Sequence, residues 1–240
     1  MMTYFLTSSS CTPGLPSLNP ANGFVEELRK ALTQPVHALF ITSAPDDPGF
    51  TEPVAVSTRE NFANSGIVFD TYNTLDRRSA DKAGEFVKQA NLIVLSGGHT
   101  PTENFFFSDI HLKELLRNYE GVLVGISAGS MNSAEIVYAQ PEEKGEAIDP
   151  NFQKFLPGLG LTKVQIIPHY QMIKDDLLDG KKLFEEVTYP DSMGHIFHAF
   201  PDGTFLLGKD GREVLRGEVY EIRDGVLTQI SREGDVIPVV

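Results

Sequence analysis

A serine stands between two glycines at the end of an apolar run in the middle of the chain. The run Gly121–Ile126 leads directly into Ser127, Gly125 and Gly129 flank it two positions away, and a helix-compatible segment follows. A strand, a sharp turn and a helix form the setting that exposes a nucleophilic serine. Side chains at the flanking positions would collide with the neighbouring strand and helix, so glycines fit there. Ser127 is the candidate nucleophile, and the alternative is a tight turn whose serine only caps the helix.

Two backbone N–H groups are candidates for binding an oxyanion. The N–H of Ala128 lies at the start of the predicted helix, where free N–H groups favour developing negative charge. The N–H of Gly98 follows the apolar run Leu92–Leu95, and strands of a parallel sheet carry ligand sites at their carboxyl ends. No Gly-Lys-Ser/Thr sequence follows, which disfavours a phosphate loop and leaves a plain turn as the alternative. The adjacent His99 is a candidate for substrate contact.

His169 is the candidate base. It follows the short apolar run Lys163–Ile167 and Pro168. If this run is a strand beside the nucleophile strand, the imidazole meets Ser127 at a shared sheet edge. A neutral imidazole there accepts the serine proton and later passes it to the leaving amine.

The base needs a carboxylate to orient it. The loop 140–149 lies between serine and histidine and contains four acidic residues. We select Glu143 first, with Glu142 and Glu146 as alternatives, and a solvated charged loop is the structural alternative for each. The predicted catalytic group is therefore a Ser127–His169–Glu143 triad.

Other candidates for chemistry are weaker. His195 and His198 are three residues apart on a strand-like run, so they face opposite sides and are poorly placed to share a metal. Cys11 has no obvious activating neighbour, and a single cysteine forms no intramolecular disulfide. The predicted reaction requires no metal and no organic cofactor.

Short apolar runs alternate with amphipathic segments over the first two-thirds of the chain. This pattern predicts an α/β fold with a mostly parallel sheet that helices cover on both faces. We find no internal repeat and no long linker, so one domain over 1–240 is expected. The predicted strands are Met2–Thr7, Val36–Thr42, Gly66–Tyr72, Asn91–Leu95, Gly121–Ile126 and Lys163–Ile167, and the helices lie near Gly23–Leu32, Glu52–Asn64, Asp76–Ala90 and Asn104–Asn118.

The C-terminal third has a different pattern. Asp-Gly pairs begin at Asp202, Asp210 and Asp224 and supply the positive φ angles that tight hairpins need. We expect antiparallel hairpins at the edge of the parallel sheet. The predicted strands are Ile196–Phe200, Thr204–Leu207, Glu213–Tyr220 and Val226–Ser231.

Charge and hydropathy limit the partners. The formal net charge is −13, and an acidic surface repels phosphate backbones, which disfavours nucleic acid as a partner. No apolar stretch approaches the roughly 20 residues of a membrane span, and Met1–Leu6 does not resemble a signal peptide. We therefore expect a cytoplasmic protein without a membrane partner. A homodimer is only the general expectation.

Three ordered motifs resemble peptidase family S51, the group of dipeptidase E and cyanophycinase. They are Ser96–Thr100, Gly125–Ser130 and Gln165–Tyr170, and the segments Tyr4–Ser9 and Phe200–Gly203 are also similar to the family. Together they span most of the chain. Three motifs in this order are far more specific than any one of them.

The resemblance implies a three-layer α/β/α sandwich, flavodoxin-like and of the class I glutamine amidotransferase type. It implies a serine nucleophile at Ser127, a base at His169 and an acid whose nearest match is Glu143, with oxyanion donors matching Gly98 and Ala128. The family turn often has asparagine where this chain has His99. The stretch after the histidine contains no arginine, whereas dipeptidase E uses basic residues there to recognise an N-terminal aspartate.

The predicted function is that of a serine-type peptidase, dipeptidase- or exopeptidase-like, that hydrolyses small peptides through an acyl-enzyme. One alternative is an esterase or amidase with a non-peptide substrate. The other is a non-catalytic binding domain of the amidotransferase-like fold.

Overall fold

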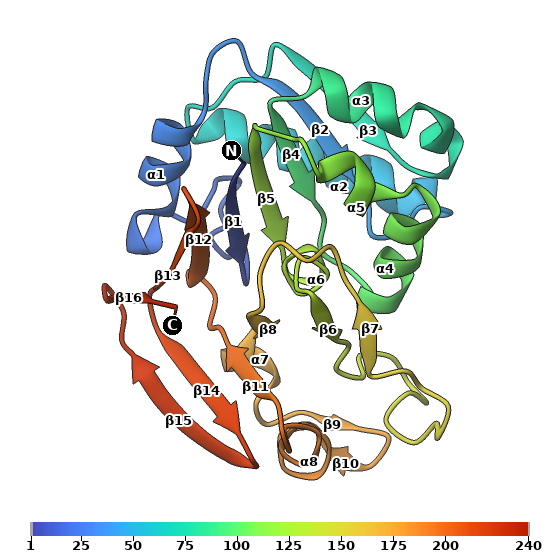
Figure 1. Ribbon diagram of the computed structural model, residues 1–240, viewed down its shortest axis with the longest axis vertical. Coiled ribbons are helices and arrows are strands. Elements are labelled where there is room, and N and C mark those ends of the chain that lie inside the picture. Colours follow the sequence, from blue (N-terminus) through green and yellow to red (C-terminus); the bar gives the residue numbers. More distant parts are fainter. Residues whose placement is uncertain (1, 240) are drawn as a thin grey trace.

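The computed structural model describes residues 2–239, and its centre is an eight-stranded sheet (Figure 1). The sheet contains β1 (Thr3–Thr7), β2 (His37–Ile41), β3 (Thr71–Leu75), β4 (Leu92–Leu95), β5 (Val122–Ile126), β12 (Phe205–Lys209), β13 (Arg212–Arg216) and β16 (Val236–Pro238). The spatial order is β16-β13-β12-β1-β5-β4-β2-β3. The strands from β1 to β3 in this order pair in parallel, and the other three are added antiparallel beside β1. The predicted mostly parallel α/β sheet is confirmed.

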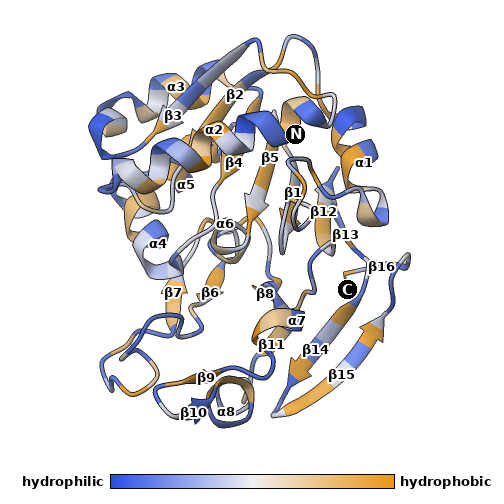
Figure 2. Ribbon diagram, turned by 180° about the vertical axis from the view of Figure 1, so that it is seen from behind, coloured by the Kyte–Doolittle hydropathy of each residue, from blue (hydrophilic) through white to orange (hydrophobic). Residues whose placement is uncertain are grey.

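Helices cover both faces of this sheet because the side chains of its strands alternate between two apolar clusters. In β2, Leu39 and Ile41 belong to one cluster and Ala38 and Phe40 to the other. The first cluster includes residues of α3 (Ala83–Gln89), α4 (Thr100–Asp109) and α5 (Leu112–Leu116), and the second includes residues of α1 (Phe24–Ala31) and α2 (Pro48–Asn64). Figure 2 shows the apolar strands between helices whose outer surfaces are mostly polar. Short 3₁₀ turns, Ala21–Gly23 and Arg77–Lys82, precede α1 and α3.

One strand of the central sheet is displaced from its predicted position. The prediction covers Gly66–Tyr72, whereas β3 begins at Thr71. Ile67 and Phe69 are buried beside α2, but they lie outside the strand ladder. Their apolar character reflects side-chain packing, so the prediction that they pair in the strand is wrong.

A second, four-stranded sheet lies beyond the carboxyl end of β5 (Figure 1). Its order is β15 (Val226–Ser231), β14 (Val219–Arg223), β11 (Ile196–Ala199) and β8 (Gln165–Ile167), with β8 and β11 parallel. The predicted hairpins are therefore divided between two sheets, and only β12, β13 and β16 extend the central one. The predicted strand Glu213–Tyr220 is interrupted at Gly217, whose φ of +104° turns the chain from β13 into β14.

Two of the three predicted Asp-Gly hairpins are present. The pairs starting at Asp210 and Asp224 have positive φ at both residues and join β12 to β13 and β14 to β15. The pair starting at Asp202 instead links β11 to β12, which lie in different sheets.

Short elements surround the carboxyl ends of β5 and β8. They are α6 (Ala128–Met131), α7 (Tyr170–Ile173), α8 (Tyr189–Asp191), a π-helical turn Leu183–Thr188, and the strand pairs β6 (Ile136–Tyr138) with β7 (Phe155–Pro157) and β9 (Leu177–Leu178) with β10 (Lys181–Lys182). Within residues 2–239, no helix has the length and apolar character needed to cross a membrane.

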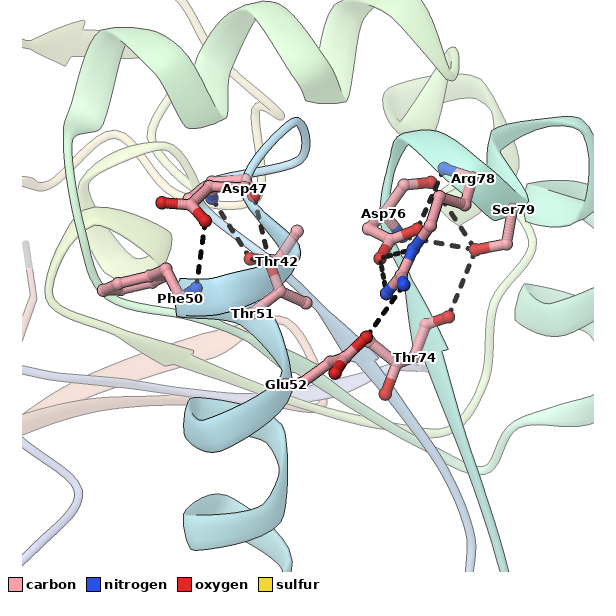
Figure 3. A network of polar contacts seen from close by, with 10 residues as sticks. Thr42, Asp47, Phe50, Thr51, Glu52, Thr74, Asp76, Arg78 and Ser79 are labelled. Atoms are coloured by element: carbon pink, nitrogen blue, oxygen red, sulfur yellow. Dashed lines mark hydrogen bonds and ion pairs between the residues drawn. The ribbon is translucent and has the colours of Figure 1, made fainter.

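A polar network fixes the loop that follows β2 (Figure 3). The buried hydroxyls of Thr42 and Thr51 are 2.8 Å apart, and the carboxylate of Asp47 caps the start of α2. Ser43, next to Thr42, donates a hydrogen bond of 2.6 Å to the carbonyl of Gly97. The hydrogen bond from Ser43 therefore holds this loop against the turn that contains Gly97 and Gly98.

Candidate active site

Ser127 has the strained backbone of a nucleophile turn. Its φ of 52° and ψ of −111° lie outside the helical and strand regions, and its N–H is held by the carbonyl of Thr7 at 3.0 Å. A Cβ at Gly129 would lie 2.6 Å from the Cβ of Leu95 on β4, and one at Gly125 would lie 3.0 Å from the backbone of Gly129. The collisions expected at the flanking positions are therefore real, and they involve the neighbouring strand and α6.

The structure brings His169 to the serine. Its Nε2 lies 3.0 Å from the Oγ of Ser127. The condition stated for this meeting, a histidine strand beside the nucleophile strand, is not met, because β8 pairs with β11 in the second sheet. The two side chains meet because the strands before them, β5 and β8, end at the same place from different sheets.

The carboxylate on the imidazole is Asp202. Its Oδ1 accepts a hydrogen bond of 2.8 Å from Nδ1 of His169, which leaves Nε2 able to accept the hydroxyl proton of Ser127. Parallel pairing of β8 with β11 explains this contact, since His169 and Asp202 follow the carboxyl ends of the two strands. The prediction that Glu143 orients the histidine is wrong. Glu143 is exposed and its loop packs toward His99.

Ser8 completes this arrangement and was not among the predicted site residues. Its fully buried hydroxyl donates to Asp202 Oδ1 at 2.8 Å and accepts from the backbone N–H of His169 at 2.7 Å. Burial alone would raise the pKa of Asp202, but the hydrogen bonds from His169 and Ser8 lower it below its usual value. The available signal was the family-like segments Tyr4–Ser9 and Phe200–Gly203, which contain both residues.

The proposed oxyanion donors lie on two turns in contact. A Cβ at Gly97 would lie 3.2 Å from the Cβ of Ser127, so the glycine turn packs directly on the nucleophile. Gly98 has a φ of +153°, and a Cβ there would lie 2.2 Å from Ser43 Oγ. No hydrogen bond within residues 2–239 uses the N–H of Gly98 or of Ala128. Helix α6 has only four residues, so local N–H groups and not a long helix would bind an oxyanion.

The glutamates of the loop 140–149 have other partners. Glu146 Oε1 lies 2.8 Å from Nε2 of His99, and its Oε2 accepts from the N–H groups of Glu142 and Glu143, also at 2.8 Å. The other ring nitrogen of His99 is 2.7 Å from the Thr102 hydroxyl. His99 thus ties the loop to the start of α4, and its contact with substrate stays a prediction.

The same histidine belongs to a cluster that could ligate a metal ion. Among the described residues, ligand atoms of His99, Glu143 and Glu146 all lie within 4.8 Å of one another. The hydrogen bond between His99 and Glu146 already satisfies two of these atoms. The hydrogen bonds of His99 and Glu146 thus account for this cluster as an anchor of the loop 140–149.

A cavity of about 250 Å³ opens beside the serine and histidine. It is small for a pocket, since ligand sites commonly occupy roughly 300–1,000 Å³. Its walls come from α6, the loop after β6, α7 and the β9 region. The lining side chains include Ser127, His169, Met131, Gln140, Pro141, Glu142, Pro168, Ile173, Asp176, Leu177, Leu178 and Leu183.

An α/β fold that joins a strained serine, a histidine and an aspartate at strand ends is that of a serine hydrolase. The chain belongs to peptidase family S51, whose model matches residues 4–212. The family membership and the enzyme class predicted from the sequence, a serine peptidase, are confirmed.

Solved structures share the fold at low sequence identity. A peptidase from an acI-B1 Actinobacterium aligns with a TM-score of 0.66 and 20% identity, covering 100% of this chain and 97% of that one. A peptidase E-like protein from Listeria monocytogenes EGD-e aligns with a TM-score of 0.60 and 16% identity, covering 96% of this chain and 100% of the other. No curated protein matches the sequence.

Proposed function

We propose that the protein is a serine exopeptidase that hydrolyses short peptides through an acyl-enzyme on Ser127. One observation carries the proposal: the imidazole of His169 contacts the Ser127 hydroxyl at 3.0 Å and the Asp202 carboxylate at 2.8 Å. In this arrangement of serine, histidine and carboxylate, the histidine acts as the base that activates the serine, and the carboxylate orients the histidine.

The proposed reaction proceeds in two acyl-transfer steps. Ser127 attacks the peptide carbonyl while its proton moves to Nε2 of His169, and Asp202 stabilises the resulting imidazolium. The N–H groups of Gly98 and Ala128 bind the tetrahedral oxyanion. The imidazolium then protonates the leaving amine, and water, activated by the same base, releases the acyl group.

The size of the cavity supports a short substrate. At about 250 Å³ it leaves little room for a long chain on the side bounded by α7 and β9. An esterase or amidase with a non-peptide substrate would use the same three side chains, so a panel of dipeptides and aryl esters separates the two. A cytoplasmic location and a homodimer stay predictions.

Removing the serine hydroxyl tests the proposal. We expect Ser127→Ala to fold normally and to lose peptide hydrolysis by a factor on the order of 10⁴–10⁶ in kcat. A fluorophosphonate probe should label the wild type and the control Ser57→Ala, whose serine is exposed on α2, but not Ser127→Ala. Peptide hydrolysis by Ser127→Ala at the wild-type rate would remove the proposed nucleophile.

A further inference from the structure

The cavity beside Ser127 is acidic and apolar. Two of its lining side chains are carboxylates, Glu142 and Asp176, and no lysine or arginine is among the residues that line it. Most of the remaining wall is apolar, with Met131, Pro141, Ile173, Leu177, Leu178 and Leu183. A pocket of this composition attracts a cation and repels an anion.

Glu142 is held in a defined position. Its Oε1 accepts hydrogen bonds from the hydroxyl of Thr100 at 2.6 Å and from the N–H of Thr100 at 3.3 Å. Its own N–H donates to Glu146 at 2.8 Å. Within residues 2–239, its Oε2 has no hydrogen-bond donor, so this oxygen can accept one from a ligand in the cavity.

The position of Glu142 relates it to the reacting bond. Thr100, its partner, lies two residues after Gly98, one of the proposed oxyanion donors. The carboxylate and Ser127 also line the same small cavity. A cation bound to Glu142 therefore lies close to the acyl group that the serine attacks, as the amino terminus of a short peptide does.

Asp176 is a weaker candidate for this contact. Its side chain makes no hydrogen bond with the described residues, so nothing fixes its carboxylate, whereas that of Glu142 is fixed by Thr100. Glu142 is exposed, but the protein atoms packed around its carboxylate still raise its pKa above the ordinary glutamate value. An ammonium group in contact with this carboxylate would stabilise the ionised form of Glu142.

We propose that Glu142 binds the free α-ammonium group of the substrate and that the apolar wall receives an uncharged side chain of its first residue. This inference rests on the proposed function. The substrates are then short peptides with a free amino terminus and an uncharged N-terminal residue. Peptides that begin with aspartate or glutamate are poor substrates, because no lysine or arginine is among the residues that line the cavity.

A p-nitroanilide panel tests the assignment. The compounds are leucine p-nitroanilide, its N-acetyl derivative, aspartate p-nitroanilide and N-acetyl-lysine p-nitroanilide. The wild type should favour the free leucine compound over its acetylated form by about 10- to 100-fold in kcat/KM, which corresponds to one charge-assisted hydrogen bond. Glu142→Gln should lose most of this preference through KM, whereas the matched variant Asp176→Asn should retain it.

A second measurement needs no variant. Leucinamide should inhibit the wild type, and N-acetyl-leucinamide should inhibit it at least about tenfold more weakly if an ammonium contact is lost. Equal inhibition, or an unchanged amino preference in Glu142→Gln, would overturn the inference. A preference for N-acetyl-lysine p-nitroanilide would show that the carboxylate binds a basic side chain of the substrate. That result would also overturn the inference.

Fluorophosphonate labelling separates this inference from the proposed function. Labelling of Ser127 together with hydrolysis of free and acetylated compounds alike leaves the peptidase proposal intact and removes the role of Glu142. A wild type that neither reacts with the probe nor cleaves any peptide removes the peptidase proposal, and the inference fails with it.

Discussion

Asp202 and Glu143 carry the same functional group in opposite surroundings. Asp202 lies behind the imidazole of His169 and accepts hydrogen bonds from it and from Ser8. Glu143 is exposed on a loop whose contacts lead to His99. Only the first arrangement can fix the tautomer of the base and stabilise its protonated form.

Matched neutral variants distinguish the two carboxylates. We expect Asp202→Asn to lower kcat by a factor on the order of 10³–10⁴ with little change in KM, as the loss of an orienting aspartate does in other serine peptidases. Glu143→Gln should stay within about twofold of the wild type, as expected for an exposed side chain. Steady-state kinetics on one peptide decide the matter. Equal losses in both variants would restore the loop glutamate to the triad.

The serine and histidine could be found from local sequence patterns, whereas no local pattern identified the acid. Ser127 lies in a local pattern of strand, glycines and helix, and His169 directly follows a strand. The position of Asp202 depends on the pairing of β8 with β11, which joins segments distant in the chain. Its Asp-Gly pair also fits an ordinary turn, and that local interpretation concealed its role.

The nucleophile turn depends on how closely α6 approaches β4. A Cβ at Gly129 would lie 2.6 Å from the Cβ of Leu95 and 2.7 Å from its carbonyl oxygen. The carbonyl belongs to a central strand that is paired on both sides. The backbone there cannot shift without disturbing the sheet, so the spacing of these elements requires glycine.

An alanine at this position should therefore damage both stability and the site. We expect Gly129→Ala to lower the free energy of unfolding by about 1–3 kcal/mol, the range for overpacking, and to slow fluorophosphonate labelling. The control is Gly84→Ala on α3, where the new Cβ would meet Leu115 at an ordinary 3.6 Å. That change should be neutral or stabilise the protein by up to about 1 kcal/mol. Urea unfolding that ranks the two variants in the reverse order contradicts the packing argument.

Local signals predict strands and turns well, but they do not assign a strand to a sheet. The turns at Asp210 and Asp224 agree with their residue type, because Asp-Gly supplies two positive φ angles, but the same pair at Asp202 links two sheets and forms no hairpin. The division of β12 to β15 between two sheets occurs at Gly217, which interrupts the segment predicted as a single strand. A glycine inside a predicted strand is the sequence feature that could have indicated this break.

At the scale of the whole molecule, one buried acid makes stability depend on pH. Glu103 is fully buried, Asn132 donates to one of its oxygens at 2.9 Å, and the other oxygen has no partner among the described residues. Burial raises its pKa well above the ordinary value. At pH values between the unfolded pKa and the raised native one, Glu103 therefore keeps its proton in the native state and loses it in the unfolded chain. The free energy of unfolding must decrease as the pH rises from the unfolded pKa through the raised native one.

Removing the charge removes this dependence. We expect the free energy of unfolding of Glu103→Gln to decrease less than that of the wild type between about pH 5 and pH 9. Urea titrations of both proteins at several pH values measure the difference, in which the contributions of all other groups cancel. Parallel curves over this range would show that Glu103 is ionised in the native protein.

The placement of β1 has a consequence for biosynthesis. This strand pairs with β5 on one side and with β12 on the other, and Ser8 at its end contacts Asp202. A ribosome releases the first of these segments long before the last. A nascent chain can already contain the serine and the histidine while it still lacks the aspartate and the partner that closes the sheet. The proposed triad therefore cannot assemble until synthesis has passed Asp202, and β1 lacks its second partner until β12 has also been made.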